Sequence, residues 1–151
     1  MNLIEIFTDG ACRGNPGKGG WGAMIRSNGL EESLYGGNIS TTNNIMELTA
    51  AIKALEHIPE NSNVVLTTDS KYVMQGITEW IKNWKTRNWK TASKKPVLNK
   101  ELWKRLDNLT NLHSIEWKWV KGHSGHRENE IADQLANKGI CLLYTSPSPR
   151  D

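Results

Sequence analysis

The chain begins with an apolar run that ends in an acidic residue and is followed by a glycine-rich stretch. Residues 3–7 include leucine, two isoleucines and phenylalanine, which favour a buried strand. We expect this strand to end at residues 8–10, and the segments 15–17 and 19–20 to form turns, because glycine and proline suit turn geometry. Asp9 would then stand at the carboxyl end of a strand, where ligands bind in open sheets with parallel strands. Its alternative role is that of an ordinary turn residue.

The next segments predict two more strands in an antiparallel meander. Residues 21–26 and 30–41 are separated by Ser27-Asn28-Gly29, a sequence that suits a hairpin turn. Gly36 and Gly37 lie within the third expected strand and indicate a bulge or the close approach of another backbone. The first part of the chain is therefore expected to be all β.

Beyond the third strand the pattern changes to alternating helices and strands. Apolar residues at helical spacing over 48–58 predict a helix capped by Asn43 and Asn44. Residues 64–68 predict a short strand, and the intervening helix makes it parallel to the first strand. The sequence thus predicts an α/β fold, with further helices over 78–87, 99–109 and 127–138 and a strand over 115–120.

Three acidic residues stand where these elements begin or end. Asp69 follows its strand as Asp9 follows the first, and Glu47 lies in the first turn of a helix. If the two parallel strands are neighbours, Asp9 and Asp69 lie side by side, and a divalent cation would relieve their repulsion. Each of the other acids also has a plainer explanation: Glu47 as the capping partner of Asn44, and Asp69 as a helix cap.

Positive charge is concentrated between Lys82 and Arg105. This segment holds nine lysines and arginines and one acid, whereas the rest of the chain holds ten bases and fifteen acids. We expect residues 88–98 to form a projecting loop, and the basic arm to contact the phosphates of a polyanion. Four tryptophans are interleaved with these charges, the first two of them expected to attach the arm to the body of the protein: Trp80, Trp84, Trp89 and Trp103.

A loop near the end of the chain holds two histidines between glycines. His123 can titrate near neutral pH, which suits proton transfer, although a loop histidine is more often only solvated. His126 stands at the expected start of the last helix. Asp133 follows in that helix beside Ala132 and Ala136, and alone would be an ordinary surface acid.

No feature of the sequence predicts export, a membrane span or a disulfide framework. The N-terminus lacks a basic and then apolar signal, and no run approaches the roughly 20 apolar residues that a span needs. Cys12 and Cys141 are the only cysteines, so we expect a cytoplasmic protein with no membrane partner. Residues 141–151 lack periodicity and contain two Ser-Pro steps, which predicts one domain over 1–140 and a non-native, poorly structured tail.

Six motifs together resemble those of ribonuclease H type 1 of the bacterial kind. Each is weak alone, but their order and spacing over about residues 1–140 are specific. The motifs are Phe7-Thr8-Asp9-Gly10, Gly14-Asn15-Pro16-Gly17, Asn43-Asn44-Ile45-Met46-Glu47-Leu48, Thr68-Asp69-Ser70, Trp119-Val120-Lys121-Gly122-His123-Ser124-Gly125 and Glu128-Asn129-Glu130-Ile131-Ala132-Asp133.

The resemblance implies an RNase H-like α/β fold, with a five-stranded mixed sheet flanked by helices on both faces and a basic protrusion. It implies a monomeric endonuclease, without an obligate protein partner, that cleaves the RNA of RNA/DNA hybrids with two Mg²⁺ or Mn²⁺ ions and leaves 3′-hydroxyl and 5′-phosphate ends. It makes Asp9, Glu47, Asp69 and Asp133 the metal ligands and gives His123 a role in proton handling or product release. The implied substrate contacts are Asn15, Thr42, Asn43, Asn44, Trp80, Trp84, Lys85, Lys90, Lys94 and Lys95.

One position departs from the family pattern, and two other functions are compatible with parts of it. Ile45 stands where many bacterial members carry arginine, so one polar contact with substrate is expected to be missing or replaced. A hybrid-binding module without effective catalysis is the first alternative, and the four carboxylates argue against it. A strand-transfer nuclease on the same fold is the second, and it would lack the basic arm and the Gly-His-Ser-Gly loop.

Overall fold

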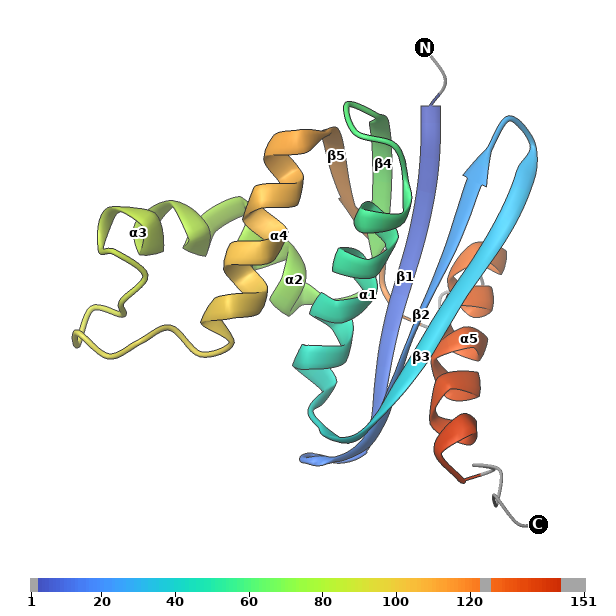
Figure 1. Cartoon of the computed structure of the whole chain (residues 1–151), viewed down its shortest axis with the longest axis horizontal. Coiled ribbons are helices and arrows are strands. Elements are labelled where there is room, and N and C mark those ends of the chain that lie inside the picture. The colour runs from blue at the N-terminus through green and yellow to red at the C-terminus, as the bar shows by residue number, and fades with distance from the viewer. Residues whose placement is uncertain (1–2, 123–125, 145–151) are drawn as a thin grey trace.

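The computed structural model describes residues 3–122 and 126–144, and five strands in this part form one mixed sheet in the order β3-β2-β1-β4-β5 (Figure 1). The first strand is antiparallel to the second and parallel to the fourth, as expected from the crossover. The five-stranded mixed sheet is therefore confirmed. The strands are β1 (Leu3–Gly14), β2 (Gly17–Ser27), β3 (Leu30–Thr41), β4 (Asn63–Thr68) and β5 (Ser114–Trp119).

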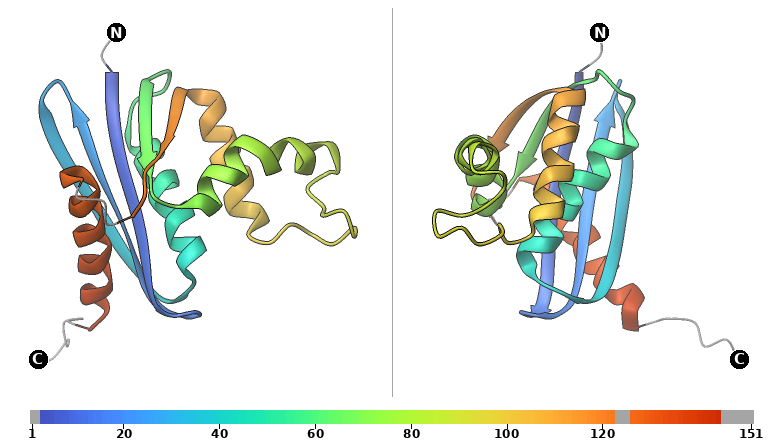
Figure 2. Two further views of the ribbon diagram at one scale, coloured as in Figure 1. Left: turned by 180° about the vertical axis from the view of Figure 1, so that it is seen from behind. Right: turned by 60° about the vertical axis from the view of Figure 1, so that its left-hand side comes forward.

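The helices are α1 (Asn43–His57), α2 (Lys71–Gln75), η1 (Gly76–Trp80), α3 (Ile81–Thr86), α4 (Lys100–Leu112) and α5 (Arg127–Tyr144). Helices α1 and α4 cover one face of the sheet and α5 covers the other, while α3 and the loop after it project sideways (Figure 2). The helical stretch expected over 78–87 starts earlier, at Lys71, because Ser70 caps it there. Within the described ranges, no helix is long and apolar enough to cross a membrane.

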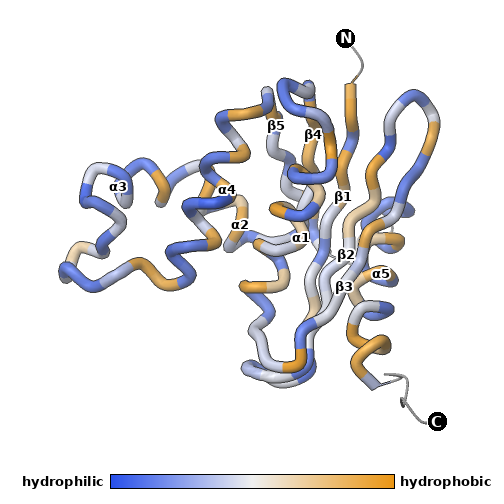
Figure 3. The backbone as a smooth tube through the Cα atoms, viewed as in Figure 1, coloured by the Kyte–Doolittle hydropathy of each residue, from blue (hydrophilic) through white to orange (hydrophobic). Residues whose placement is uncertain are grey.

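Two hydrophobic cores hold these layers together. The larger lies between the sheet and helices α1 and α4, where Ile6, Leu48, Leu66 and Leu106 are fully buried. Figure 3 shows hydrophobic stretches along β1 and β4 and a largely hydrophilic outer end of the projecting segment. A smaller core on the other face is built on Phe7 and includes residues of β2 and α5. The sheet is therefore fixed from both sides.

The first strand extends past the point where the sequence predicted its end. β2 stays paired with β1 as far as Gly14 and Gly17, so Asp9 lies inside β1. Only the parallel pairing with β4 ends as expected, at Thr8 and Thr68. The turn predicted at 19–20 is also wrong, because Gly20 belongs to β2 and an added Cβ there would overlap the Ala136 carbonyl oxygen of α5.

The helix caps also differ from those expected. Thr42, not Asn43 or Asn44, caps α1, and its Oγ1 accepts a hydrogen bond of 3.2 Å from the Ile45 N–H. Ser70 caps α2 by accepting from the Val73 N–H at 3.1 Å. Neither plainer explanation therefore holds, because Glu47 is not a capping partner and Asp69 is not a cap.

Helix α5 runs further than the sequence predicted. The close approach expected at Gly36 and Gly37 is confirmed, because a Cβ on Gly37 would overlap the Gly139 carbonyl oxygen. Ile140 is fully buried, so the sheet supports the last turns and the helix continues to Tyr144. The irregular structure expected from residue 141 is wrong for residues 141–144, whereas 145–151 lie outside the described residues. The division of the chain at residue 140 stays a prediction.

Two glycines beside Asp9 allow helices to touch the sheet from opposite faces. A Cβ on Gly10 would lie 2.6 Å from the Glu47 backbone nitrogen of α1. Gly22 of β2 is the cross-strand partner of Asp9. A Cβ on Gly22 would lie 2.6 Å from the Ala132 carbonyl oxygen of α5. The sheet around Asp9 therefore meets the backbone of both helices, α1 at Gly10 of β1 and α5 at Gly22 of β2.

We expect Gly10→Ala to destabilise the protein by about 1–3 kcal/mol, the usual cost of overpacking, because the new methyl group meets helix backbone. Urea unfolding measures this loss. Gly29→Ala is the control: its methyl group meets open space, and only its backbone, with φ of +79°, is strained. Stabilisation by Mg²⁺ should fall in Gly10→Ala and stay unchanged in Gly29→Ala. Equal Mg²⁺ responses in both variants would contradict the role of Gly10.

Candidate active site

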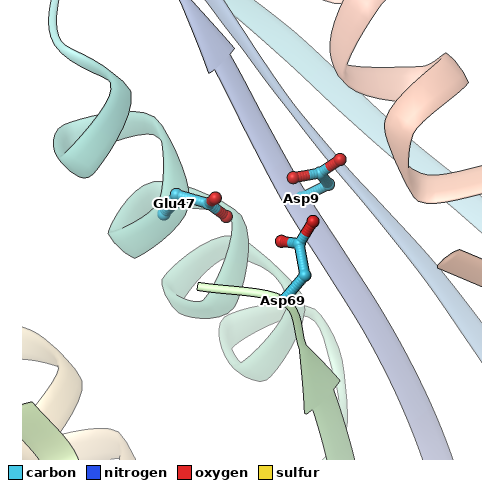
Figure 4. Close-up of side chains that lie close together, drawn as sticks. All are labelled: Asp9, Glu47 and Asp69. Atoms are coloured by element: carbon cyan, nitrogen blue, oxygen red, sulfur yellow. The ribbon is translucent and has the colours of Figure 1, made fainter. Parts of the chain in front are cut away.

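Three carboxylates meet where β1 and β4 stop pairing (Figure 4). Asp9 comes from β1, Glu47 from α1, and Asp69 from the residue after β4. One oxygen of each side chain lies within 4.8 Å of an oxygen of each other one. The predicted neighbourhood of Asp9 and Asp69 is therefore confirmed, and Glu47 completes it.

Burial makes this cluster costly to ionise. Asp9 and Glu47 are only 8% and 6% exposed. Burial, followed by the charge of Asp69, raises the pKa of Asp9 from 3.8 to about 8. Burial and the charges of Asp9 and Asp69 likewise hold the pKa of Glu47 well above its ordinary value. The Gly10 N–H donates to Asp9 Oδ1 at 2.8 Å and lowers the pKa of Asp9, but burial prevails.

The cluster has the chemistry of a divalent-cation site. Within the described residues, Glu47 Oε1 is buried and accepts no hydrogen bond. A buried carboxylate oxygen without a partner is unfavourable unless a cation satisfies it. Oxygen ligands are those that Mg²⁺ and Mn²⁺ prefer, and Mg²⁺ keeps several waters, so a few carboxylates suffice. Asp9, Glu47 and Asp69 therefore fit the metal that the resemblance implies.

Asp133 lies beside this cluster without belonging to its tightest group. Its charge contributes to raising the pKa values of both Asp9 and Glu47. Helix α5 carries it there by packing against Gly22, and an ion pair of 2.6 Å between Arg26 and Glu128 fixes the start of that helix. The structure thus brings three of the four predicted metal ligands together and places the fourth next to them.

The predicted histidine loop is only partly described, and His123 itself lies outside the described residues. Gly122, directly before it, borders the site, because a Cβ there would lie 3.0 Å from Asp69 Oδ2. His126 is exposed, and its carbonyl oxygen accepts a hydrogen bond of 2.9 Å from the Glu130 N–H at the start of α5. His126 therefore has the helix-start position that the sequence predicted.

The predicted minor-groove residues gather at the start of α1. Asn15 Oδ1, in the β1–β2 turn, accepts a hydrogen bond of 3.2 Å from the Asn43 backbone N–H. Asn15, Asn43 and Asn44 are exposed, and Thr42 is half-buried in its capping role. This polar group lies about one helical turn from Glu47, a position that suits substrate contact, which stays a prediction.

The tryptophans of the arm form one aromatic cluster with tilted and edge-to-face rings. Trp84 lies with ring centres 5.9 Å from Trp80, 6.3 Å from Trp89 and 5.5 Å from Trp103. Trp103 is fully buried, and its indole N–H donates to the Tyr72 hydroxyl at 3.0 Å. The expectation that Trp80 and Trp84 attach the arm to the body is confirmed, because both pack against the main core.

The lysines of the arm differ in what they contact. Lys90, Lys94 and Lys95 belong to the loop after α3, and all three are exposed. Lys90 and Lys94 line a cavity of about 410 Å³ together with Arg87. Lys85 instead pairs with Asp107 of α4, at 3.2 Å between Nζ and Oδ2. The loop lysines are therefore the better candidates for phosphate contacts, and Lys85 also serves to hold α3 against α4.

Two residues of the site were not singled out from the sequence. Gly22 admits α5, and the register of the predicted hairpin is the signal that identifies it as the partner of Asp9. Trp119 donates its indole N–H to the Asp69 backbone oxygen at 3.1 Å. Nothing in the sequence fixes the direction of that ring.

Residues 1–141 match the family model for RNase H. The chain belongs to the RNase H family. It is similar to Ribonuclease H of Halorhodospira halophila, at 62% identity over 141 residues that cover 93% of this chain and 95% of the relative. Ribonuclease HI of Pseudomonas syringae pv. tomato is 58% identical over 137 residues, with 91% of each chain covered. The chain is thus an enzyme, a nuclease of the hydrolase class.

Solved structures show the same fold. LC9-RNase H1, described as a type 1 RNase H with the type 2 active-site motif, is 34% identical with a TM-score of 0.83. The match covers 93% of this chain and 72% of that one. LC11-RNase H1, solved in complex with an RNA/DNA hybrid, is 23% identical with a TM-score of 0.69, over 94% of this chain and 99% of that one. The RNase H fold expected from the sequence is confirmed.

We expect Asp9→Asn to raise the melting temperature in EDTA at pH 8. An acid whose pKa is raised in the folded state stabilises only while protonated, so its contribution is lost as pH rises from near 4 towards 8. Removing this cost should raise Tm by at least about 2 °C, since 1 kcal/mol shifts Tm by about 2–4 °C in chains of this size.

Calorimetry at pH 8 and pH 5 measures the effect. The gain should shrink at pH 5, where folded Asp9 is already protonated. Glu60→Gln, which removes an exposed acid elsewhere, is the control and should change Tm little at either pH. A lower Tm for Asp9→Asn at pH 8 would mean that ionised Asp9 does not destabilise the metal-free protein.

Proposed function

We propose that the chain hydrolyses the RNA strand of RNA/DNA hybrids with two bound Mg²⁺ ions, leaving 3′-hydroxyl and 5′-phosphate ends. The observation that carries this proposal is the meeting of three carboxylates from three elements within 4.8 Å, in a member of the RNase H family. We assign Asp9, Glu47, Asp69 and Asp133 as the metal ligands, with Mn²⁺ as an alternative ion. The same cluster speaks against a module that only binds hybrids.

The protein contributes to this chemistry by holding the carboxylates in fixed positions that are largely shielded from water. Divalent ions, when bound, supply an activated water and neutralise charge on the leaving oxygen. Asp9 and Glu47 are nearly buried, so their charges act in a medium of low dielectric constant and act strongly. His123, which follows Gly122 at the edge of the cluster, would carry protons between the site and solvent.

Hybrid recognition would combine two surfaces. Asn15, Asn43 and Asn44 suit hydrogen bonding across a shallow minor groove, where the 2′-hydroxyls distinguish RNA from DNA. The loop lysines of the arm suit the phosphate backbone further along the same duplex. Binding would thus span both the start of α1 and the projecting loop.

We further infer that the enzyme acts as a monomer in the cytoplasm. Its two cysteines, Cys12 and Cys141, form no disulfide, as is usual in a reducing compartment. All the site residues that we assign belong to a single chain. Sedimentation at working concentration tests the monomeric state.

Cleavage of labelled substrates tests the function directly. We expect hydrolysis of the hybrid with Mg²⁺, none with EDTA, and little or none of duplex RNA, duplex DNA or single strands. Asp9→Asn should be inactive at saturating Mg²⁺, with cooperative unfolding retained, because only charge is removed. Activity of Asp9→Asn near that of the parent would refute the metal-site assignment.

The arm should govern affinity and not the chemical step. Replacing Lys90, Lys94 and Lys95 with glutamine should raise KM for the hybrid and leave kcat nearly unchanged. Each lost phosphate contact should reduce the log–log salt slope of binding by about 0.7–0.9. Lys138→Gln, on α5, is the control and should leave the slope as it is. An unchanged slope in the triple variant would place the arm away from the substrate.

His123 should contribute to turnover and not to binding. We expect His123→Ala to lower kcat by about 10- to 100-fold, at the low end for an acid–base group because water takes over part of the proton transfer. Hybrid affinity and stabilisation by Mg²⁺ should stay close to those of the parent. His126→Ala, at the start of α5, is the matched control. A larger loss of kcat in His126→Ala would show that the role belongs to the other histidine.

A further inference from the structure

The backbone of Asp69 lies just beyond the sheet. The last parallel pair of β4 and β5 is Thr68 with Trp119, and the Val120 N–H donates to the Thr68 carbonyl oxygen at 3.0 Å. The next carbonyl group, that of Asp69, is therefore outside the regular ladder. A metal ligand at such a place needs another contact to keep its direction.

The side chain of Trp119 supplies that contact. Its indole N–H donates to the Asp69 carbonyl oxygen at 3.1 Å. The ring itself is held from α2, because Lys71 Nζ lies 5.5 Å from its centre. Trp119 is 39% exposed, so packing in the core does not account for a tryptophan at this position.

The neighbouring residues confine Asp69 from its other sides. The Ser70 backbone N–H donates to Thr68 Oγ1 at 3.0 Å, which fixes the chain on the far side of Asp69. Gly122, three residues after Trp119, leaves space for Asp69 Oδ2. Trp119 and Gly122 thus contact both the backbone and the carboxylate of one residue.

We propose that Trp119 is a positioning residue for metal binding, acting through the backbone of Asp69. The hydrogen bond holds the Asp69 carboxylate towards Asp9 and Glu47 before any ion arrives. Without it, one of the restraints on Asp69 is lost, and the cost of restoring its orientation when the ion binds weakens binding. The inference rests on the metal site proposed above and assigns Trp119 no contact with the hybrid.

Trp119→Phe tests this directly, since it removes the N–H and keeps an aromatic ring. The rise of Tm with added Mg²⁺ reports ion binding without substrate. We expect Trp119→Phe to need about three- to tenfold more Mg²⁺ for the same rise, the scale of one lost hydrogen bond. In cleavage assays the Mg²⁺ requirement should rise equally, while kcat at saturating Mg²⁺ and KM for the hybrid stay near those of the parent.

Trp117→Phe is the matched control on the same strand. Trp117 pairs with Leu66 and packs against the main core, so its replacement should lower Tm without changing the Mg²⁺ requirement. An unchanged Mg²⁺ requirement in Trp119→Phe, whatever its Tm, would overturn the proposal. No Mg²⁺ response in the parent protein would instead overturn the metal site itself.

Discussion

The site depends on the close approach of two helices to one short stretch of sheet. Gly10 admits α1 from one face, and Gly22, the cross-strand partner of Asp9, admits α5 from the other. A side chain at either place would hold a helix away from the strand by the thickness of a methyl group or more. Glu47 and Asp133 reach Asp9 because neither glycine carries one.

This arrangement lowers the stability of the protein, because it places ionisable carboxylates together in a largely buried site. Three carboxylates lie within 4.8 Å of one another, and burial, followed by their mutual repulsion, raises the pKa values of Asp9 and Glu47. The hydrophobic cores on the two faces of the sheet supply the stability that offsets this unfavourable energy. A bound divalent cation would attract all three carboxylates and so offset their mutual repulsion. The features that destabilise the metal-free protein are thus those that favour an ion.

Local pattern and chain order were enough to predict the sheet and the meeting of its two aspartates. Hydrophobic spacing and turn residues located the strands, and the crossover rule placed Asp9 beside Asp69. Local pattern failed where tertiary contacts decide: pairing with β2 carries β1 past Asp9, and burial of Ile140 extends α5.

Two details of the site lay beyond any local rule. Thr42 caps α1 although asparagine is the better cap residue and Asn43 and Asn44 follow it, so the choice among the three depends on how the chain leaves β3. The hydrogen bond from Trp119 depends on the direction of a side chain at the end of β5, which strand pattern does not specify.

The most direct test is the location of Mn²⁺ by anomalous diffraction from crystals soaked in the ion. We propose that Asp9, Glu47 and Asp69 form one cation site. We predict an anomalous peak between these three carboxylates, and its loss in crystals of Asp9→Asn. Density for Mn²⁺ only elsewhere on the protein, at concentrations that support hydrolysis in solution, would contradict it.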